Sequence, residues 1–285
     1  MYEAYVPAHI TGFFKIHLSD NPLFTGSIGA GICLDLGLRT FVKVERGSNI
    51  KLFFNGSEID SEIIRIILNK MEVNDEISII AKQESPFSIG YGYGMSGASI
   101  LGLALAINKA LGEPFKKEDI GRIAHVIEVE GKTGLGDVLA QMVGGFELRT
   151  KPGAPGFGEI KRLSHPEGWL VVTTPVKMRK TCDLIANYHK INEVGDLCYK
   201  EFLKNQNIEN FIRISKYFWD RLEIIDQDLI KVAKIYKNYG IEHISFKKGI
   251  VYGIVRNEDF PLENGVFEKN GIKLIVSRIS NRGAY

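Results

Sequence analysis

The sequence predicts an α+β protein made of two domains. Strand patterns fill the part before residue 85, and two helical patterns follow a glycine-rich loop. A segment rich in glycine and proline then leads into a second half with helices and strands of its own. With 285 residues, 45% of them apolar, the chain is long enough to bury two hydrophobic cores. We therefore expect a compact globular protein.

Three segments before the glycine-rich loop are typical of half-buried strands. Each mixes β-branched, aromatic and polar residues in approximate alternation, and each is bounded by Gly, Asn or Ser. The predicted strands cover residues 33–45, 50–54 and 77–82.

Two helices are expected after this loop. From Ser96 to Leu111, Ala, Leu and Ile recur at helical spacing, and Gly112 and Pro114 end the pattern. The second helix is expected to end near Gly131. Its buried face is predicted by apolar residues that repeat at i, i+3, i+4 and i+7, namely Ile120, Ile123, Ala124 and Ile127.

The Gly- and Pro-rich segment 144–168 is the expected domain junction. We predict an N-terminal domain over residues 1–158 and a C-terminal α+β domain over residues 159–285. In the second domain we expect a buried strand, then several amphipathic helices, then further strands, over residues 169–175, 179–240 and 241–285 respectively.

The charge composition excludes a global preference for nucleic acid or membrane. The formal net charge is +2, from 36 basic and 34 acidic residues, so any recognition of anions must be local. No stretch approaches the ~20 apolar residues of a membrane span, and the N-terminus lacks signal-peptide features, so we expect a cytoplasmic protein. Cys33, Cys182 and Cys198 are too few and too far apart for a disulfide framework or a zinc site, so we expect reduced thiols.

A loop with four glycines in eight positions, residues 90–97, stands directly before the first helix. Glycine permits positive φ and close approach of a ligand, and a helix start presents unpaired N–H groups. This arrangement is typical of a phosphate-binding loop. We therefore expect the chain to bind a nucleotide at residues 90–97.

Three other interpretations of the glycine patterns must be weighed. Residues 92–97 match the G-x-G-x-x-G dinucleotide pattern, but Pro86 interrupts the buried strand that should lead into the first glycine. A Walker A motif over residues 126–133 fails, because Val126 stands where glycine is needed. The third interpretation is a glycine-rich turn that merely lets a helix pack.

Residues 124–145 combine two carboxylates with a tight glycine turn. Glu128 follows His125 by three residues, on one helix face, and Asp137 lies at the end of the turn. Such a pair suits phosphorylation of an alcohol, because one carboxylate can accept or orient the hydroxyl proton while the other holds Mg²⁺ between phosphates. The alternative is that Asp137 only caps the short helix that follows.

Several sequence blocks resemble the GHMP kinase superfamily of galacto-, homoserine, mevalonate and phosphomevalonate kinases. Residues 92–98, GYGMSGA, are similar to its phosphate loop, and Glu128 with TGLGD at 133–137 is similar to its Glu and SG-x-x-D region. Further blocks resemble the archaeal pantoate kinase family within it. These blocks are residues 7–14, 26–31 and 132–156.

The resemblance implies a two-domain GHMP kinase fold, with an N-terminal domain like ribosomal protein S5 domain 2 and a ferredoxin-like C-terminal domain. It implies transfer of the γ-phosphate of ATP to the primary hydroxyl of pantoate, which yields 4-phosphopantoate for coenzyme A biosynthesis. Asp137 would act as base or hydroxyl orienter, with Ser96 and Glu128 as catalytic residues that contact Mg²⁺. The implied nucleotide-binding residues are Gly90, Gly92, Tyr93, Gly94, Met95, Ser96, Gly97 and Ala98.

Pantoate carries a carboxylate, two hydroxyls and a gem-dimethyl centre, so its pocket needs a cation, hydroxyl partners and an apolar wall. Arg149 is the candidate for the carboxylate, and Ser27 and His125 are candidates for the hydroxyls. His9 is a further candidate. Each candidate also has a structural interpretation. Arg149 could be a surface cation, Ser27 could use its hydroxyl within a turn, and His125 could be a helix residue whose hydrogen bonds are made within the protein.

The sequence departs from the superfamily at two places. Met95 replaces the first Ser of the phosphate loop, and the C-terminal glycine loop is not readable. Its counterpart is expected within residues 243–255, where Lys247 or Lys248 could take its place electrostatically. Two other functions stay open: a kinase for another hydroxy acid or alcohol, such as mevalonate or homoserine, and a non-catalytic nucleotide-binding regulator. The expected partner is a small-molecule substrate, and a homodimer is also open.

Overall fold

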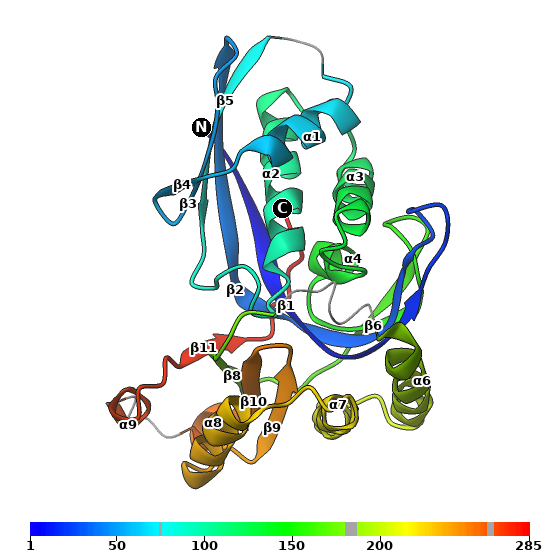
Figure 1. The fold of residues 1–285 in the computed structure, drawn as a ribbon, viewed down its shortest axis with the longest axis vertical. Helices are drawn as coiled ribbons and strands as arrows, with labels where there is room; N and C mark the ends of the chain where they lie inside the picture. Colours follow the sequence, from blue (N-terminus) through cyan, green and yellow to red (C-terminus); the bar gives the residue numbers. More distant parts are fainter. Residues whose placement is uncertain (74–75, 180–186, 261–264) are drawn as a thin grey trace.

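The computed structural model describes residues 1–73, 76–179, 187–260 and 265–285. It contains two β-sheets with helices packed against them, which confirms the predicted α+β class (Figure 1). The larger sheet has seven strands. They are β1 (Tyr2–His17), β2 (Gly26–Arg46), β3 (Ile50–Phe54), β4 (Ser57–Ile59), β5 (Ile77–Glu84), β6 (Phe146–Lys151) and β7 (Glu159–Leu163).

The long strands β1 and β2 run antiparallel and organise the larger sheet. β2 pairs with β5 over its second half and with β6 over residues 29–32, so the strand order is β4-β3-β5-β2-β6-β7, with β1 beside β2. The register of β1 shifts between Pro7 and His9, and again between Thr11 and Phe13. Such irregularities redirect the neighbouring side chains. Both lie beside residues of the site described below.

The sequence prediction missed β1 and the start of β2. Every residue of β1 from Val6 to Phe13 is buried, so the strand lacks the alternation that marks a half-buried strand. It is buried because helix α2 (Met95–Ala110) packs against it, as do α6 (Tyr188–Lys204) and α7 (Ile208–Arg221). In Figure 1, α6 and α7 lie on the opposite side of the sheet from α2.

Helices α1 (Glu62–Lys70), α2, α3 (Lys117–Glu130) and α4 (Asp137–Val143) lie on the same face of the larger sheet (Figure 1). α2 and α3 confirm the two helices expected after the glycine-rich loop, whereas α1 was not predicted. α2 is almost entirely buried. On α3, three residues of the predicted face are buried and Ile123 is half-buried.

The smaller sheet is antiparallel throughout, with the order β11-β8-β10-β9. Numbered along the chain this order is 4-1-3-2, which confirms the ferredoxin-like C-terminal domain. α7 packs against β9, and α8 (Gln227–Asn238) packs against β9 and β10. Two short helical segments, η1 (Asn257–Asp259) and α9 (Gly265–Lys269), complete this half. Its strands are β8 (Trp169–Pro175), β9 (His243–Lys247), β10 (Ile250–Arg256) and β11 (Ile275–Arg278).

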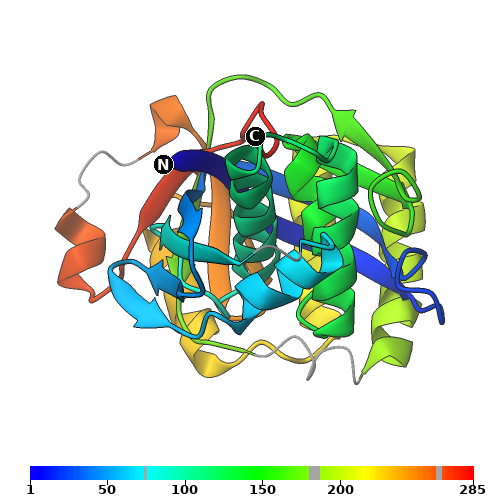
Figure 2. The same ribbon diagram turned by 90° about the horizontal axis from the view of Figure 1, so that it is seen from above.

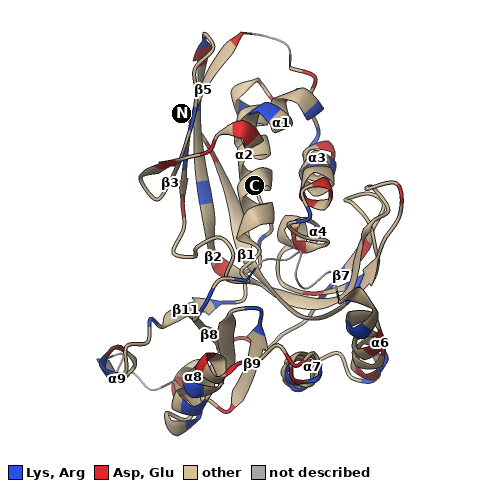
Figure 3. Cartoon of the chain, in the orientation of Figure 1, with Lys and Arg blue, Asp and Glu red and all other residues tan. Residues whose placement is uncertain are grey.

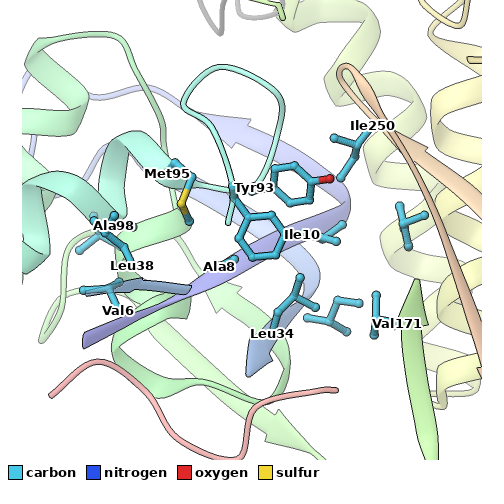
Figure 4. Packing of buried hydrophobic residues seen from close by; sticks show 14 of the residues in the cluster. Val6, Ala8, Ile10, Leu34, Leu38, Tyr93, Met95, Ala98, Val171 and Ile250 are labelled. Carbon is cyan, nitrogen blue, oxygen red and sulfur yellow. The ribbon is translucent and has the colours of Figure 1, made fainter. Parts of the chain in front are cut away.

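One hydrophobic cluster joins the two sheets and holds the glycine-rich loop between them. Tyr93 of this loop packs its ring on Phe87 at a centroid distance of 4.3 Å, and its hydroxyl lies 2.8 Å from Thr173 Oγ1 on β8. Figure 4 shows Tyr93 among apolar side chains of β1 and β2, with Val171 and Ile250 of the smaller sheet nearby. The position of the loop therefore depends on both halves of the chain.

Strand pairing does not follow the expected boundary between residues 158 and 159. β7, which begins at Glu159, pairs with β6 in the larger sheet. The end of the chain also returns to that sheet, where Tyr285 and Tyr5 exchange backbone hydrogen bonds of 2.8 and 2.9 Å. Figure 2 shows the two termini near each other. The boundary stays a prediction, and the pairing favours one after Leu163.

Acidic and basic residues are interspersed over the helices of both halves, in keeping with the small net charge (Figure 3). No helix in the described ranges combines the length and apolarity that crossing a membrane requires. Cys33 and Cys198 are buried, free thiols, whereas Cys182 lies outside the described residues.

Candidate active site

The glycine-rich loop joins β5 to α2 and has a conformation that requires glycine. Gly90, Gly92 and Gly94 all have positive φ, at 93°, 124° and 68°. At Gly92 a Cβ atom would lie 2.8 Å from the carbonyl oxygen of Lys247, so a larger residue would clash there. Gly94 caps α2, and the first-turn N–H groups of a helix have no partner within that helix. The loop therefore has the geometry that favours anion binding.

A cavity of about 440 Å³ opens beside this loop. We call it the glycine-loop cavity. It collects four basic side chains against one carboxylate, which suits a polyanionic ligand. Its walls are Gly90, Gly92, Gly94, Met95, Ser96, Gly131, Lys132, Thr133, Asp137, Met178, Arg179, Lys247 and Lys248.

Five of the eight expected nucleotide-binding residues line the glycine-loop cavity. The side chain of Tyr93 instead packs in the core, as described above, and Gly97 and Ala98 are buried in the first turn of α2. Any contact of these three residues with a ligand would have to come from the backbone. Lys247 and Lys248 lie at the turn between β9 and β10, so the segment expected to replace the C-terminal glycine loop does reach this cavity.

Asp137 is the first residue of α4 and does not cap it, because the N-cap is Gly136. Its carboxylate oxygen Oδ1 lies 2.6 Å from His9 Nδ1, 3.5 Å from Lys247 Nζ and 3.5 Å from Thr11 Oγ1. Burial opposes ionisation, but the charge of Lys247 and the hydrogen bond from His9 outweigh it. Together they hold the pKa of Asp137 well below its usual range. Asp137 is therefore an ionised carboxylate held by cations rather than a helix cap.

Asp137 lies between the glycine-loop cavity and a second cavity of about 60 Å³. We call the second one the inner cavity. The two cavities share only Asp137, Lys247 and Lys248 among the described residues. The inner cavity is lined by Thr11, Phe14, Ser27, Gly134, Leu135, Gly136, Asp137, Trp219, Lys247 and Lys248. A group bound in either cavity would therefore reach the same carboxylate.

Arg149 is buried beside the inner cavity rather than exposed on the surface. Its side chain is 1% exposed, and Nη1 donates a hydrogen bond of 2.6 Å to Glu147 Oε1. Nε and Nη2 have no partner among the described residues. A Cβ atom on Gly136, in the cavity wall, would lie 3.4 Å from Nε and 2.6 Å from Ser27 Oγ. The structure thus brings Arg149 and Ser27 together, as expected.

His9 links the carboxylate of Asp137 to the Arg149 group. Its Nε2 lies 3.1 Å from Glu147 Oε1, the oxygen that also accepts from Arg149, while Nδ1 faces Asp137. Both ring nitrogens of His9 therefore lie within hydrogen-bond distance of a carboxylate oxygen. Lys247 Nζ also donates to the carbonyl oxygen of His9, at 3.1 Å. The result is a chain of hydrogen-bonded side chains that runs from Arg149 through Glu147 and His9 and ends at Asp137.

The structure does not bring His125 to either cavity. His125 is fully buried on α3, and its Nε2 lies 2.9 Å from the carbonyl oxygen of Thr25. Burial lowers its pKa, which favours the neutral ring. This geometry fits the alternative of a structural histidine better than the expected contact with a substrate hydroxyl.

Glu128 is a buried carboxylate whose oxygens have no hydrogen-bond partner of normal geometry among the described residues. The backbone N–H of Val138 is close enough to favour the charged form weakly. Burial and the nearby charge of Asp137 raise the pKa of Glu128 to about 8. A Cβ atom on Gly97 would lie 2.7 Å from Glu128 Oε1, so this carboxylate faces the first turn of α2, where Ser96 also lies.

Two oxygen donors near a phosphate-binding loop fit the chemistry of Mg²⁺. Among the described residues no group of three or more His, Cys, Asp or Glu could hold a metal ion. Mg²⁺ does not need such a group, because it is usually held by one or two carboxylates together with substrate phosphates and water. Glu128, with unpartnered oxygens, and Ser96 are therefore a suitable partial ligand set.

Sequence reasoning missed several residues of the inner cavity. Thr11 and Phe14 lie in the block 7–14 that the resemblance singled out, but neither received a role. Lys247 was considered only as a substitute for the missing glycine loop, although it contacts Asp137 directly. Trp219 lies on an amphipathic helix far along the chain, and nothing in its surrounding pattern distinguishes it from a core residue.

Comparison with known proteins identifies relatives of the whole chain. The GHMP kinases N terminal domain model matches residues 61–145. A pantoate kinase of Methanocaldococcus jannaschii is 36% identical over 236 residues, which are 81% of this chain and 84% of that protein. A pantoate kinase of Thermococcus kodakarensis is 33% identical over 270 residues, which are 90% of this chain and 88% of that protein.

Among solved structures, a phosphotransferase related to the CoA biosynthesis pathway superposes with a TM-score of 0.87 at 27% identity. The match covers 99% of this chain and 97% of that one. These relatives agree with the two-domain fold and with the resemblance carried by the phosphate loop. The chain belongs to the pantoate kinase family of the GHMP kinases, which are ATP-dependent small-molecule kinases.

Proposed function

We propose that this protein transfers the γ-phosphate of ATP to the primary hydroxyl of pantoate, which yields 4-phosphopantoate for coenzyme A biosynthesis. The observation that carries the proposal is the position of Asp137, a carboxylate shared by the glycine-loop cavity and the inner cavity. A phosphoryl donor in one cavity and a hydroxyl in the other would meet at this residue. The names of the relatives supply the substrate.

The inner cavity and the buried Arg149 beside it have the groups that pantoate requires. Arg149 presents two unpartnered guanidinium nitrogens for a carboxylate, and a guanidinium can grip both carboxylate oxygens at once. Ser27 supplies a hydroxyl at the same place. Phe14, Leu135 and Trp219 supply an apolar wall for the gem-dimethyl centre. Binding by these groups would point the primary hydroxyl toward Asp137.

Asp137 would orient the acceptor hydroxyl rather than remove its proton before transfer. Because Lys247 and His9 hold its pKa low, Asp137 is a weak base, although it remains a strong hydrogen-bond acceptor. Phosphoryl transfer passes through a loose transition state, in which positioning and charge stabilisation matter most. Lys247, which lines both cavities, would stabilise the charge of the transferring group.

Glu128 and Ser96 would hold Mg²⁺ against the phosphates of ATP. When bound, this ion neutralises charge on the phosphates. The raised pKa of Glu128 means that the carboxyl carries a proton at neutral pH until a cation is present. The N–H groups at the start of α2 and the glycines of the loop would bind the phosphates themselves.

Measurement of ADP release with pantoate, mevalonate and homoserine tests the proposal. We expect turnover with pantoate at a kcat/KM at least about 10³-fold above that with the other two, because only pantoate matches both Arg149 and the apolar wall. A preference for mevalonate or homoserine would show that this compound, rather than pantoate, is the substrate. Binding of ATP without turnover on any of the three would favour a non-catalytic regulator. A cytoplasmic location and a homodimer remain predictions.

A further inference from the structure

The indole N–H of Trp219 is a buried hydrogen-bond donor for which the described part of the chain offers no acceptor. Trp219 is 1% exposed and forms part of the wall of the inner cavity. A buried donor without a partner destabilises a protein, and native proteins rarely contain one without a functional reason. This observation suggests that a bound molecule supplies the acceptor.

Trp219 brings the C-terminal half of the chain to a cavity that is otherwise built mainly from the N-terminal half. It lies near the end of α7, where its ring contacts Phe218 at a centroid distance of 5.4 Å and Phe14 of β1 at 6.4 Å. These aromatic contacts fix the plane of the indole. The orientation of its N–H is therefore set by packing before any ligand binds.

The three unpartnered donors beside the inner cavity equal in number the three oxygens of the proposed substrate other than its primary hydroxyl. Arg149 has two such donors, Nε and Nη2, and Trp219 has one, Nε1. Pantoate has two carboxylate oxygens, a 2-hydroxyl oxygen and the primary hydroxyl that faces Asp137. Since the planar guanidinium suits both carboxylate oxygens, Trp219 Nε1 is the unpartnered buried donor that remains for the 2-hydroxyl oxygen. Ser27 Oγ also lines the cavity but is not one of the unpartnered buried atoms.

We propose that Trp219 donates its indole N–H to the 2-hydroxyl oxygen of the acceptor and thereby selects 2-hydroxy acids. This inference rests on the proposed function, because it names the contact that recognises one group of the proposed substrate. A site with a buried donor built for a hydroxyl discriminates strongly against an analogue that lacks this hydroxyl, because the donor then stays unpaired. Trp219 is in this view a specificity residue and takes no part in the transfer.

Kinetics with two acceptors and two variants test the contact. The acceptors are pantoate and 4-hydroxy-3,3-dimethylbutanoate, which lacks only the 2-hydroxyl. Trp219→Phe keeps an aromatic ring but removes the donor, and we expect it to lower kcat/KM for pantoate about 10- to 100-fold while changing that for the analogue less than about threefold. The control is Trp169→Phe, which alters the only other Trp, a residue of β8 outside both cavities.

A spectroscopic measurement on the unmutated active site avoids any effect of Trp219→Phe on folding. In ¹⁵N-labelled protein the two Trp side chains give separate indole N–H resonances, and the Trp169→Phe variant assigns the one from Trp219. Saturating pantoate should shift the Trp219 resonance downfield, as a new hydrogen bond does. The analogue without the 2-hydroxyl should produce a smaller shift at saturation.

Three results separate this inference from the proposed function. Equal losses on both acceptors in Trp219→Phe, or an indole resonance that responds equally to both, would show that Trp219 makes only apolar contact and would overturn the inference. The inference would also fail if Trp219→Phe left the preference for pantoate over the analogue unchanged. A wild-type enzyme that phosphorylates neither acceptor would instead reject the proposed function itself.

Discussion

Asp137, which is half-buried, and Glu128, which is fully buried, are carboxylates at the two ends of one glycine turn, yet their surroundings favour opposite charge states. Asp137 has cationic and hydroxyl partners within 3.5 Å, which hold its pKa low. Glu128 has oxygens without partners of normal geometry and a pKa raised to about 8. Burial opposes ionisation at both sites, so the partners decide the difference. At neutral pH the surroundings therefore favour the charged form of Asp137 and the protonated form of Glu128.

We propose that the difference corresponds to two tasks in phosphoryl transfer. A carboxylate that orients a hydroxyl must be charged before the substrate arrives, and Lys247 and His9 ensure this for Asp137. A carboxylate that receives a metal ion should have free oxygens, and Glu128 keeps them by having few partners of its own. The following predictions test whether this division of roles holds.

Asp137→Asn should have the largest effect. The amide cannot replace the charged acceptor between the two cavities, so we expect kcat to fall by about 10³-fold or more. Circular dichroism should show an intact fold. The matched control is Asp119→Asn, which alters a half-buried carboxylate of α3 that pairs with Arg122 outside both cavities and should stay within about twofold of wild type. Retention of kcat within about tenfold would mean that Asp137 neither orients the hydroxyl nor accepts its proton.

Glu128→Gln should lower kcat by about 10²- to 10³-fold and raise the Mg²⁺ concentration needed for half-maximal activity. In contrast to Asp137→Asn, it should not lower the melting temperature of the metal-free protein, because the neutral amide resembles the protonated carboxyl. Glu130→Gln, two residues along the same helix and exposed beside Lys70, is the control. An unchanged Mg²⁺ dependence would remove Glu128 from the set of metal ligands.

Removal of the Arg149 guanidinium should raise the KM for pantoate about 10- to 100-fold with a smaller change in kcat. Because Arg149 neutralises the buried Glu147, the test uses Arg149→Met together with Glu147→Gln, and Glu147→Gln alone serves as the control. Initial rates at varied pantoate and saturating ATP separate the change in KM from the change in kcat. A loss confined to kcat would show that Arg149 acts through the chain to His9 and Asp137 rather than by binding the carboxylate.

The pH dependence of stability should show the smallest and most specific effect. The pKa of Glu128 is raised from 4.5 to about 8 on folding, so the folded state binds more protons than the unfolded state between these values. The free energy of unfolding of metal-free protein should therefore fall as pH rises from about 4.5 to 8. The lowered pKa of Asp137 affects the free energy of unfolding only at more acidic pH. There the stabilisation from its ionised form is lost as the carboxylate becomes protonated.

Urea unfolding at several pH values, compared between wild type and Glu128→Gln, isolates this contribution. The free energy of unfolding of the variant should change less with pH over this range than that of the wild type. Mg²⁺ with nucleotide should reduce the pH dependence of the wild type. Identical profiles in the two proteins would show that Glu128 has an ordinary pKa in the folded state.

The elements with a clear local pattern were predictable. The strands β3 and β5, the helices α2 and α3 and the glycine-rich loop all followed from alternation, helical spacing or turn residues. β1 was missed because both its faces are buried and because its polar residues, His9 and Thr11, contact the candidate active site rather than solvent. The boundary at residue 158 was placed by composition, whereas β7 joins the larger sheet through pairing with β6.

The sequence by itself determined the α+β class, the phosphate loop and the resemblance of its carboxylates to those of a kinase family, because glycine patterns and short motifs act over a few residues. Only the tertiary structure decided which side chains meet Asp137. His9, Lys247 and Trp219 lie far apart in the chain, and only the packing of α7 and the β9–β10 turn against β1 brings them together. The tertiary structure also decided that Arg149 lies buried beside the inner cavity and that His125 lies in the wall of neither cavity. The charge state of a side chain and the direction in which it points depend on such distant neighbours, so no local sequence pattern predicts them.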